Sequence, residues 1–405
     1  MHYDFDEIIS REETNSLSFE GWKSYIFKGR DNINFQYKDK DYIRMWVADM
    51  DFATPAPVLD AIRERLDRKI LGYTQLFDPK YFATLESWFR RHYDVVIKKK
   101  EVVLSPGVVP ALKHLVPLIM QADESVLICT PSYAPFKVAG DFNKRRVLTS
   151  KLVNTNGDYR MDFADIEQKI SNPDNKISLF ILCNPHNPTG RVWSKEELAR
   201  LGQICVEHGV WLISDEIHCD LLRAGKQFQS MVNVLPGYKK LITCTAPSKT
   251  FNLAGNLVSH IFIRDSILRA KWLERHNDIQ NPLALAAAQA AYRDCDEWLV
   301  QLRGYLDENF ALVEQFLQTH LPAAKFKVPE ATYLAWIDFS AYLNATDSFS
   351  EPAYFFAKEA GVLLEGGNMF VDNGDGFVRL NIACPRSVLQ EGLERILQAL
   401  VKQEI

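Results

Sequence analysis

The chain has 405 residues, of which 47% are hydrophobic and 24% are charged, and its 47 Lys and Arg against 52 Asp and Glu leave a formal net charge of -5. This composition excludes a disordered chain, and the balanced charge argues against nucleic acid as a partner. The seven scattered cysteines include no C-x-x-C pair, so we expect reduced thiols and no metal site. No apolar stretch approaches the ~18 residues of a membrane span, and the N-terminus is too acidic for a signal peptide. We therefore expect a cytoplasmic protein that does not bind membranes.

Short apolar runs alternate with longer helical patterns in the first two thirds of the chain. Apolar residues recur on one face of the segment 194–208, and Ser194 with Glu197 forms a capping box at its start, which predicts a helix. Repeated alternation of strands and helices predicts an α/β fold with a mostly parallel sheet covered by helices on both sides. The candidate strands are 101–104, 125–129, 178–183, 210–214 and 240–245.

The last third of the chain has a different pattern, which predicts a smaller α+β domain. A long amphipathic helix spans Leu306 to Leu317, strands are expected at 333–339 and 377–382, and a second capping box at Ser387 predicts the start of the last helix. The pattern is interrupted at Asn281-Pro282. We therefore predict an N-terminal segment, 1–45, that packs with the small domain, a large cofactor-binding domain, 46–282, and a small C-terminal domain, 283–405.

Small and polar residues follow the first two candidate strands. Gly107 precedes a helical pattern whose first N–H groups could bind a phosphate, although an ordinary strand-to-helix turn explains the same residues. After the second strand, Tyr133 lies in a proline-rich loop that could hold its ring flat against a ligand, or it is a tyrosine of the core. Because ligands of open α/β sheets bind at the carboxyl ends of the strands, both loops are candidate parts of one site.

An amide, an acid and a lysine follow the next three strands. Asn184 opens a loop dense in turn residues, and Asp215 follows a buried strand, where a carboxylate needs a cationic or hydrogen-bonding partner. Lys249 stands beside small residues that could desolvate its amine and make it nucleophilic. A phosphate site, an aromatic ring, a carboxylate and a lysine together are the groups that pyridoxal 5'-phosphate requires.

These motifs make the sequence resemble the fold-type I aminotransferase superfamily, and within it the MalY/PatB type of cystathionine β-lyases, or C-S lyases. The resemblance covers nearly the whole chain and implies the aminotransferase type I fold. Its distinctive stretches are 46–52, 105–111, 184–190, 214–218, 248–252 and 379–381.

The resemblance assigns roles to individual residues. It implies that Lys249 condenses with the cofactor aldehyde, that Asp215 pairs with the ring nitrogen, and that Asn184 bonds the ring oxygen. It also implies that Tyr133 stacks on the ring and that Arg379 clamps the substrate carboxylate in a bidentate fork.

The same resemblance implies which residues bind the phosphate and that a second subunit contributes to the site. The backbone of Val108 and Val109 and the hydroxyl of Ser248 are expected to hold the phosphate. Tyr73 resembles a tyrosine that reaches the phosphate of the neighbouring subunit, so we expect a homodimer. Two positions differ from the wider aminotransferase pattern, namely His218, where tyrosine is usual, and Leu257, where a phosphate-binding arginine is usual. A cofactor-binding role and a structural role for His218 both stay open.

The expected activity is β-elimination from a cysteine S-conjugate such as cystathionine, with Lys249 as the general base that removes the Cα proton. The products are a thiol, pyruvate and ammonia. Two alternatives use the same fold: an aminotransferase, and a lyase with a second role in binding a transcription regulator. A nicotinamide enzyme fits poorly, because no G-x-G-x-x-G motif follows the first good strand.

Overall fold

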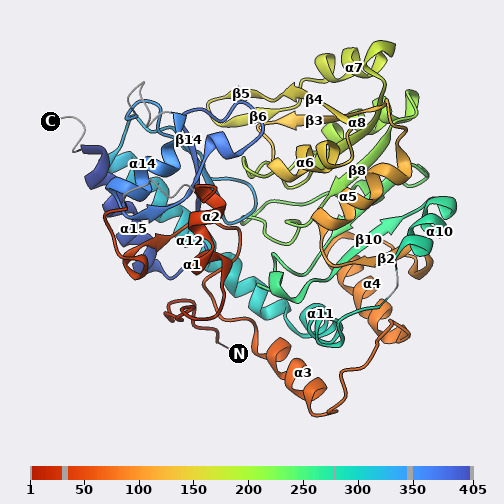
Figure 1. Ribbon diagram of the computed structural model, residues 1–405, viewed down its shortest axis with the longest axis horizontal. Helices are drawn as coiled ribbons and strands as arrows, with labels where there is room; N and C mark the ends of the chain where they lie inside the picture. The colour runs from red at the N-terminus through yellow and green to blue at the C-terminus, as the bar shows by residue number, and fades with distance from the viewer. Residues whose placement is uncertain (1, 30–34, 277–278, 344–349, 402–405) are drawn as a thin grey trace.

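A computed structural model describes residues 2–29, 35–276, 279–343 and 350–401. Its largest sheet has seven strands in the order β2-β10-β9-β8-β7-β3-β4 (Figure 1). Strand β10 runs antiparallel to both of its neighbours, β2 and β9, and the other four strand pairs of this sheet are parallel, so the predicted mostly parallel sheet is confirmed. The strands are β2 (Val102–Ser105), β3 (Ser125–Thr130), β4 (Arg146–Lys151), β7 (Ile177–Cys183), β8 (Trp211–Asp215), β9 (Leu241–Thr245) and β10 (Ser259–Ile263).

The five predicted strands correspond to β2, β3, β7, β8 and β9, and each is found within about one residue of its expected bounds. The sequence patterns missed β4, which is only partly buried, and β10, the antiparallel strand. Strand β10 is fully buried between β2 and β9. Its short apolar run is typical of a strand inside a sheet, but periodicity alone does not distinguish such a run from a buried helix segment.

Helices cover both faces of the large sheet, as expected. Alternate strand residues pack into two separate cores, since Val126 and Ile128 join one and Leu127 joins the other. The first core is closed by α5 (Val108–Ile119), α6 (Ala134–Phe142) and α10 (Ser266–Arg275), and the second by α7 (Phe163–Ser171) and α8 (Lys195–Glu207).

The predicted capping box of α8 is confirmed. The side chain of Ser194 accepts a hydrogen bond from the N–H of Glu197, and the Glu197 carboxylate accepts one from the N–H of Ser194. Two backbone N–H groups that the helix itself cannot satisfy are thereby paired.

The C-terminal part contains a three-stranded antiparallel sheet in the order β11-β14-β13. Its strands β11 (Leu334–Asp338) and β14 (Phe377–Asn381) confirm the two predicted strands, whereas β13 (Glu365–Gly366) is too short to have been predicted. The helices of this part are α12 (Asp296–His320), α14 (Pro352–Glu359) and α15 (Arg386–Val401).

The predicted capping box at the start of the last helix is wrong. Helix α15 begins at Arg386, so Ser387 already lies inside its first turn and is exposed. The carbonyl of Pro385 accepts hydrogen bonds from the N–H groups of Val388 and Leu389, and this backbone contact opens the helix.

The N-terminal residues lie against the C-terminal part of the chain. They form α1 (Leu17–Glu20), α2 (Trp22–Ile26) and β1 (Ile43–Arg44), which pairs in parallel with β12 (Val362–Leu363). Two longer helices follow, α3 (Ala56–Leu66) and α4 (Pro79–Tyr93), and both contact α11 (Pro282–Asp294). Asn281 caps α11 by accepting the N–H of Leu283. The division of the chain into 1–45, 46–282 and 283–405 stays our proposal.

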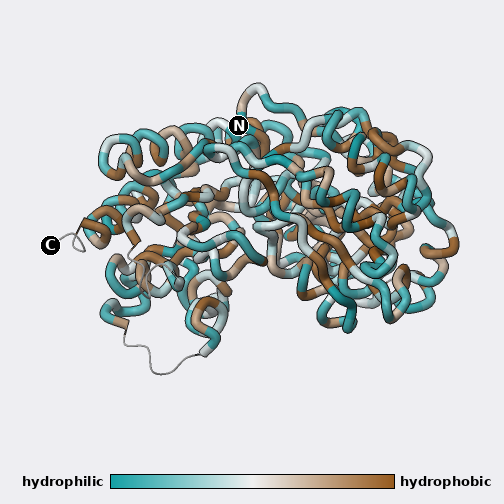
Figure 2. The backbone as a smooth tube through the Cα atoms, turned by 90° about the horizontal axis from the view of Figure 1, so that it is seen from above, coloured by the Kyte–Doolittle hydropathy of each residue, from teal (hydrophilic) through white to brown (hydrophobic). Residues whose placement is uncertain are grey.

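Polar and apolar stretches alternate closely along the chain (Figure 2). In the part of the chain that the structure describes, no helix combines the length and the apolar character needed to cross a membrane.

Candidate active site

A cavity of about 230 Å³ opens at the carboxyl ends of the parallel strands. Loops that follow β2, β3, β7, β8 and β9 all contribute to its lining, because the ends of parallel strands meet at one edge of the sheet. The residues singled out in the sequence that line it are Val108, Val109, Tyr133, Asp215, His218, Ser248 and Lys249. Asn184, Arg379 and Tyr73 do not line it.

The loop after β2 brings the start of a helix to the cavity. Gly107 is the N-cap of α5, and Val108 and Val109 are its first two residues, so their N–H groups have no acceptor within the helix. The loop after β9 places Ser248 on the same cavity. A hydroxyl and a helix N-terminus together can bind an anion such as a phosphate.

Lys249 is partly buried and lies in the loop after β9. Its Nζ donates a hydrogen bond to the carbonyl of Ala48 at 2.6 Å. Burial lowers the pKa of Lys249, Arg379 lowers it further, and Asp49 and Asp215 oppose this decrease. A lowered pKa increases the fraction of the neutral, nucleophilic amine near neutral pH.

Asp215 is the last residue of β8 and is buried. Among the described residues, the N–H of Ile217 is the hydrogen-bond donor to its carboxylate, at 3.2 Å from Oδ1. Burial raises the pKa of Asp215 to about 7, and the charge of Lys249 opposes the increase. A buried carboxylate with so few donors is stabilised by a cationic group placed against it.

Asn184 differs from the expectation. It is fully buried beside β7, where its Nδ2 donates to the carbonyl of Gln229 at 3.0 Å and its Oδ1 accepts from the N–H of Trp193 at 3.3 Å. The side chain that reaches the cavity from this loop is that of Asn187, three residues later. The sequence contained a signal for this residue, since Asn187-Pro188 is the second Asn-Pro step of the loop.

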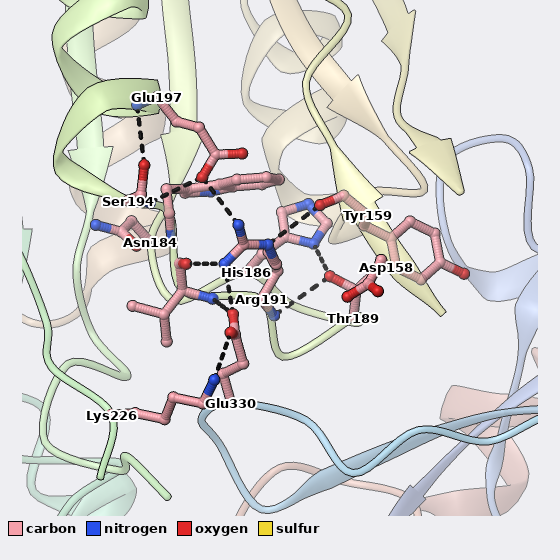
Figure 3. A network of polar contacts seen from close by, with 12 residues as sticks. Asp158, Tyr159, Asn184, His186, Thr189, Arg191, Ser194, Glu197, Lys226 and Glu330 are labelled. Carbon is pink, nitrogen blue, oxygen red and sulfur yellow. Dashed lines mark hydrogen bonds and ion pairs between the residues drawn. The ribbon is translucent and has the colours of Figure 1, made fainter. Parts of the chain in front are cut away.

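A network of ion pairs around Arg191 and Glu330 holds the loop that begins at Asn184 (Figure 3). Arg191 lies 2.9 Å from Glu197 and 2.5 Å from Glu330, and Lys226 lies 2.9 Å from the same Glu330. Glu330 comes from the C-terminal part of the chain, more than a hundred residues from its partners, so sequence reasoning missed it. The network ties the cavity loop to that part of the chain.

Arg379 lies in β14, buried beside the cavity. Its Nη1 donates to Oδ1 of Asn187 at 3.0 Å, and its Nη2 donates to the carbonyl of Trp46 at 3.0 Å. Nη2 also forms an ion pair of 2.5 Å with Oε2 of Glu365, a residue that the sequence patterns did not single out. The guanidinium thus contacts the lining through Asn187.

His218 and Tyr73 have opposite surroundings. His218 is buried at the cavity, burial lowers its pKa to about 3, and its Nδ1 has no partner among the described residues. Its ring is therefore neutral, with its centroid 6.3 Å from that of Tyr333 in an edge-to-face contact. Tyr73 is 97% exposed and lies away from the cavity of its own chain.

Residues 40–396 match the family model for aminotransferases of class I and II. The chain is 41% identical to the cystathionine beta-lyase PatB of Bacillus subtilis over 89% of this chain and 93% of the relative. It is 30% identical to the protein MalY of Escherichia coli over 98% of this chain and 99% of the relative. It also resembles the crystal structure of the PLP-bound C-S lyase from Staphylococcus hominis, with a TM-score of 0.94 and 47% identity over 99% of each chain.

Proposed function

We propose, from the premise that this chain belongs to the class I and II aminotransferase family, that it is a PLP-dependent carbon-sulfur lyase. It acts on cysteine S-conjugates such as cystathionine by β-elimination and releases a thiol, pyruvate and ammonia. The observation that carries this proposal is the amine of Lys249, in one cavity with buried Asp215 and the N-terminus of α5, in a relative of a cystathionine beta-lyase.

Pyridoxal phosphate fits the residues of the cavity. We assign its phosphate to the N–H groups of Val108 and Val109 and to the hydroxyl of Ser248, and its ring nitrogen to Asp215, a carboxylate that favours a cationic partner. The ring of Tyr133 supplies an aromatic surface on the cavity wall. When bound, the cofactor supplies an electrophilic carbon for an amine and a cationic ring that accepts electron density.

The protein's own side chains bind and orient the cofactor and the substrate, and they move protons. Lys249 would hold the cofactor covalently. Once the substrate amine has displaced it, the freed Nζ would accept the Cα proton of the substrate, a task that its lowered pKa favours. Asp215 would keep a proton at the ring nitrogen. We assign the amide contact with the ring to Asn187 in place of Asn184, and we assign the substrate carboxylate to Arg379, which Asn187 orients. Neutral His218 forms part of the wall.

The test of this function is the release of pyruvate from cystathionine by the purified protein without an added oxo acid. Replacing Lys249→Ala should lower the rate by about a thousandfold or more, because the covalent and proton-transfer roles are lost together. Lys239 is exposed, so Lys239→Ala is the matched control and should leave the rate unchanged. Turnover that requires an oxo acid would contradict the lyase and indicate an aminotransferase.

A homodimer and a cytoplasmic location are part of the proposal. The segment between α3 and α4 exposes a run of large apolar side chains, which supports contact with a second copy. We assign Tyr73, from this run, to the phosphate of the partner's site. The seven cysteines are free and buried, which supports a reducing compartment. The exposed residues of the run are Ile70, Leu71, Tyr73 and Phe77.

A further inference from the structure

The side chain of Glu365 forms an ion pair with the arginine that we assign to the substrate carboxylate. Oε2 of Glu365 lies 2.5 Å from Nη2 of Arg379, and the two side chains are 9% and 2% exposed. The residues face each other across the antiparallel pair β13 and β14, so strand register fixes the contact. Because water screens this pair little, its attraction is much stronger than that of a surface ion pair.

The remaining contacts of Arg379 limit how a second carboxylate can bind. Nη1 donates to Asn187 and Nη2 also donates to the carbonyl of Trp46, whereas Nε has no acceptor among the described residues. A guanidinium binds a carboxylate in a fork through the edge of Nε and Nη2 or the edge of Nη1 and Nη2. Both edges include Nη2, which donates to the carbonyl of Trp46 and forms the ion pair with Glu365.

Of these two partners of Nη2, Glu365 is the one that can leave by a side-chain rotation. The Trp46 acceptor is a backbone carbonyl in a buried segment. The backbone after Glu365 is also fixed, because Gly367 packs so closely on Gly374 that a Cβ at Gly367 would lie 1.6 Å from the carbonyl oxygen of Gly374. When a second carboxylate binds at Nη2, the group that moves away is therefore the side chain of Glu365.

We propose that Glu365 is a positioning residue that occupies the carboxylate fork of Arg379 and yields it when the amino acid binds. This inference rests on the proposed function, because it takes Arg379 as the residue that binds the substrate carboxylate. Before binding, Glu365 keeps the buried guanidinium paired and oriented. During binding, one carboxylate replaces another at Nη2, so the affinity for the amino acid is lower than that of an unoccupied fork.

The experiment compares holoenzymes that carry Glu365→Gln, Glu365→Asp and the control Glu359→Gln. Glu359 is a half-buried residue of α14 that pairs with Lys358. The ligand is propionate, a carboxylate without an amine, and its Kd is measured by calorimetry together with the KM and kcat for pyruvate release. Glu365→Gln should bind propionate about tenfold more tightly, since one buried competing charge is gone, and should lower KM more than it changes kcat. Glu365→Asp should give an intermediate Kd, and Glu359→Gln should match the wild type.

Unchanged or weaker propionate binding by Glu365→Gln, with a normal Tm and normal cofactor absorbance, would overturn the inference. If Glu365→Gln does not fold, the Kd of Glu365→Asp for propionate tests the inference instead, and a wild-type Kd for that variant overturns it equally.

Arg379→Gln separates this inference from the proposed function. Propionate binding that is lost in Arg379→Gln but insensitive to Glu365 refutes the inference alone, whereas binding that survives Arg379→Gln refutes the assigned role of Arg379. Absence of pyruvate from the wild type refutes the proposed function.

Discussion

Two neighbouring carboxyl groups at the end of β8 show how surroundings separate structural residues from reactive ones. Glu216 accepts hydrogen bonds from the Ser214 and Ser230 hydroxyls and from the N–H of Met231, whereas Asp215 accepts one from Ile217. Burial raises the pKa of both carboxyl groups to about 7. Glu216 is thereby fixed within the protein, while Asp215 keeps acceptor capacity for a group in the cavity.

Asp215 should make the protein less stable at higher pH once the cofactor has been removed. Its pKa in the folded chain, about 7, exceeds the ordinary value of 3.8, so its contribution to stability is present below pH ~4 and is lost as the pH rises through 7. Asp215→Asn removes this loss. We compare the difference in unfolding free energy, variant minus wild type, at two pH values. We expect this difference to be more positive at pH 8 than at pH 5, by on the order of 2 kcal/mol.

Urea unfolding of the two cofactor-free proteins at the two pH values measures this difference. Asp141→Asn, on the exposed face of α6, is the control for a carboxylate at the surface. A gain in stability from Asp215→Asn that does not change between pH 5 and pH 8 would refute the prediction. With pyridoxal phosphate bound, the same substitution should instead destabilise the protein, because the ring nitrogen loses its acidic partner.

At the scale of single elements, two serines with the same sequence signal have different structural roles. Ser194 caps α8 through a reciprocal pair of hydrogen bonds, whereas Ser387 lies exposed within the first turn of α15. Ser194→Ala should therefore cost about 1 kcal/mol of unfolding free energy, and Ser387→Ala less than about 0.5 kcal/mol. The shift of the denaturation midpoint at constant m-value measures both effects. Equal losses from the two substitutions would show that the capping box of α8 contributes no more than an ordinary surface serine.

At the scale of the whole molecule, the exposed apolar run between α3 and α4 predicts how two copies share a site. We expect chains carrying Lys249→Ala and chains carrying Tyr73→Phe each to lose most of their activity alone. Mixed under conditions that exchange subunits, they should form hybrid dimers in which one site has an intact Lys249 and receives an intact Tyr73 from the other chain. Pyruvate release by the mixture should recover to about a quarter of the wild-type rate if subunits pair at random.

The hybrid experiment also tests the alternative that Tyr73 serves its own chain. In that case no hybrid site has both residues intact, and mixing restores nothing. Light scattering on the wild type provides the independent measurement, and a monomer at assay concentration would refute the proposed dimer.

The local sequence determined five of the seven strands of the large sheet and the residues at their ends. A strand is a short run of consecutive residues, and its carboxyl end is fixed along with it, so Asp215 and Lys249 could be placed at one edge before any contact was known. By contrast, the roles of Asn184 and Asn187 depended on which side chain the loop turns toward the cavity. Each lies beside a proline, and local chemistry does not distinguish them.

Contacts between distant segments were decided by the tertiary structure alone. Glu365 meets Arg379 because β13 and β14 pair in one register, and Glu330 meets Arg191 because the C-terminal part packs against the loop after β7. Neither pair has a sequence pattern, since an ion pair between two different elements requires no particular spacing in the chain. The chain by itself therefore identified the chemistry of the cavity, and packing determined which partners hold its charged groups in place.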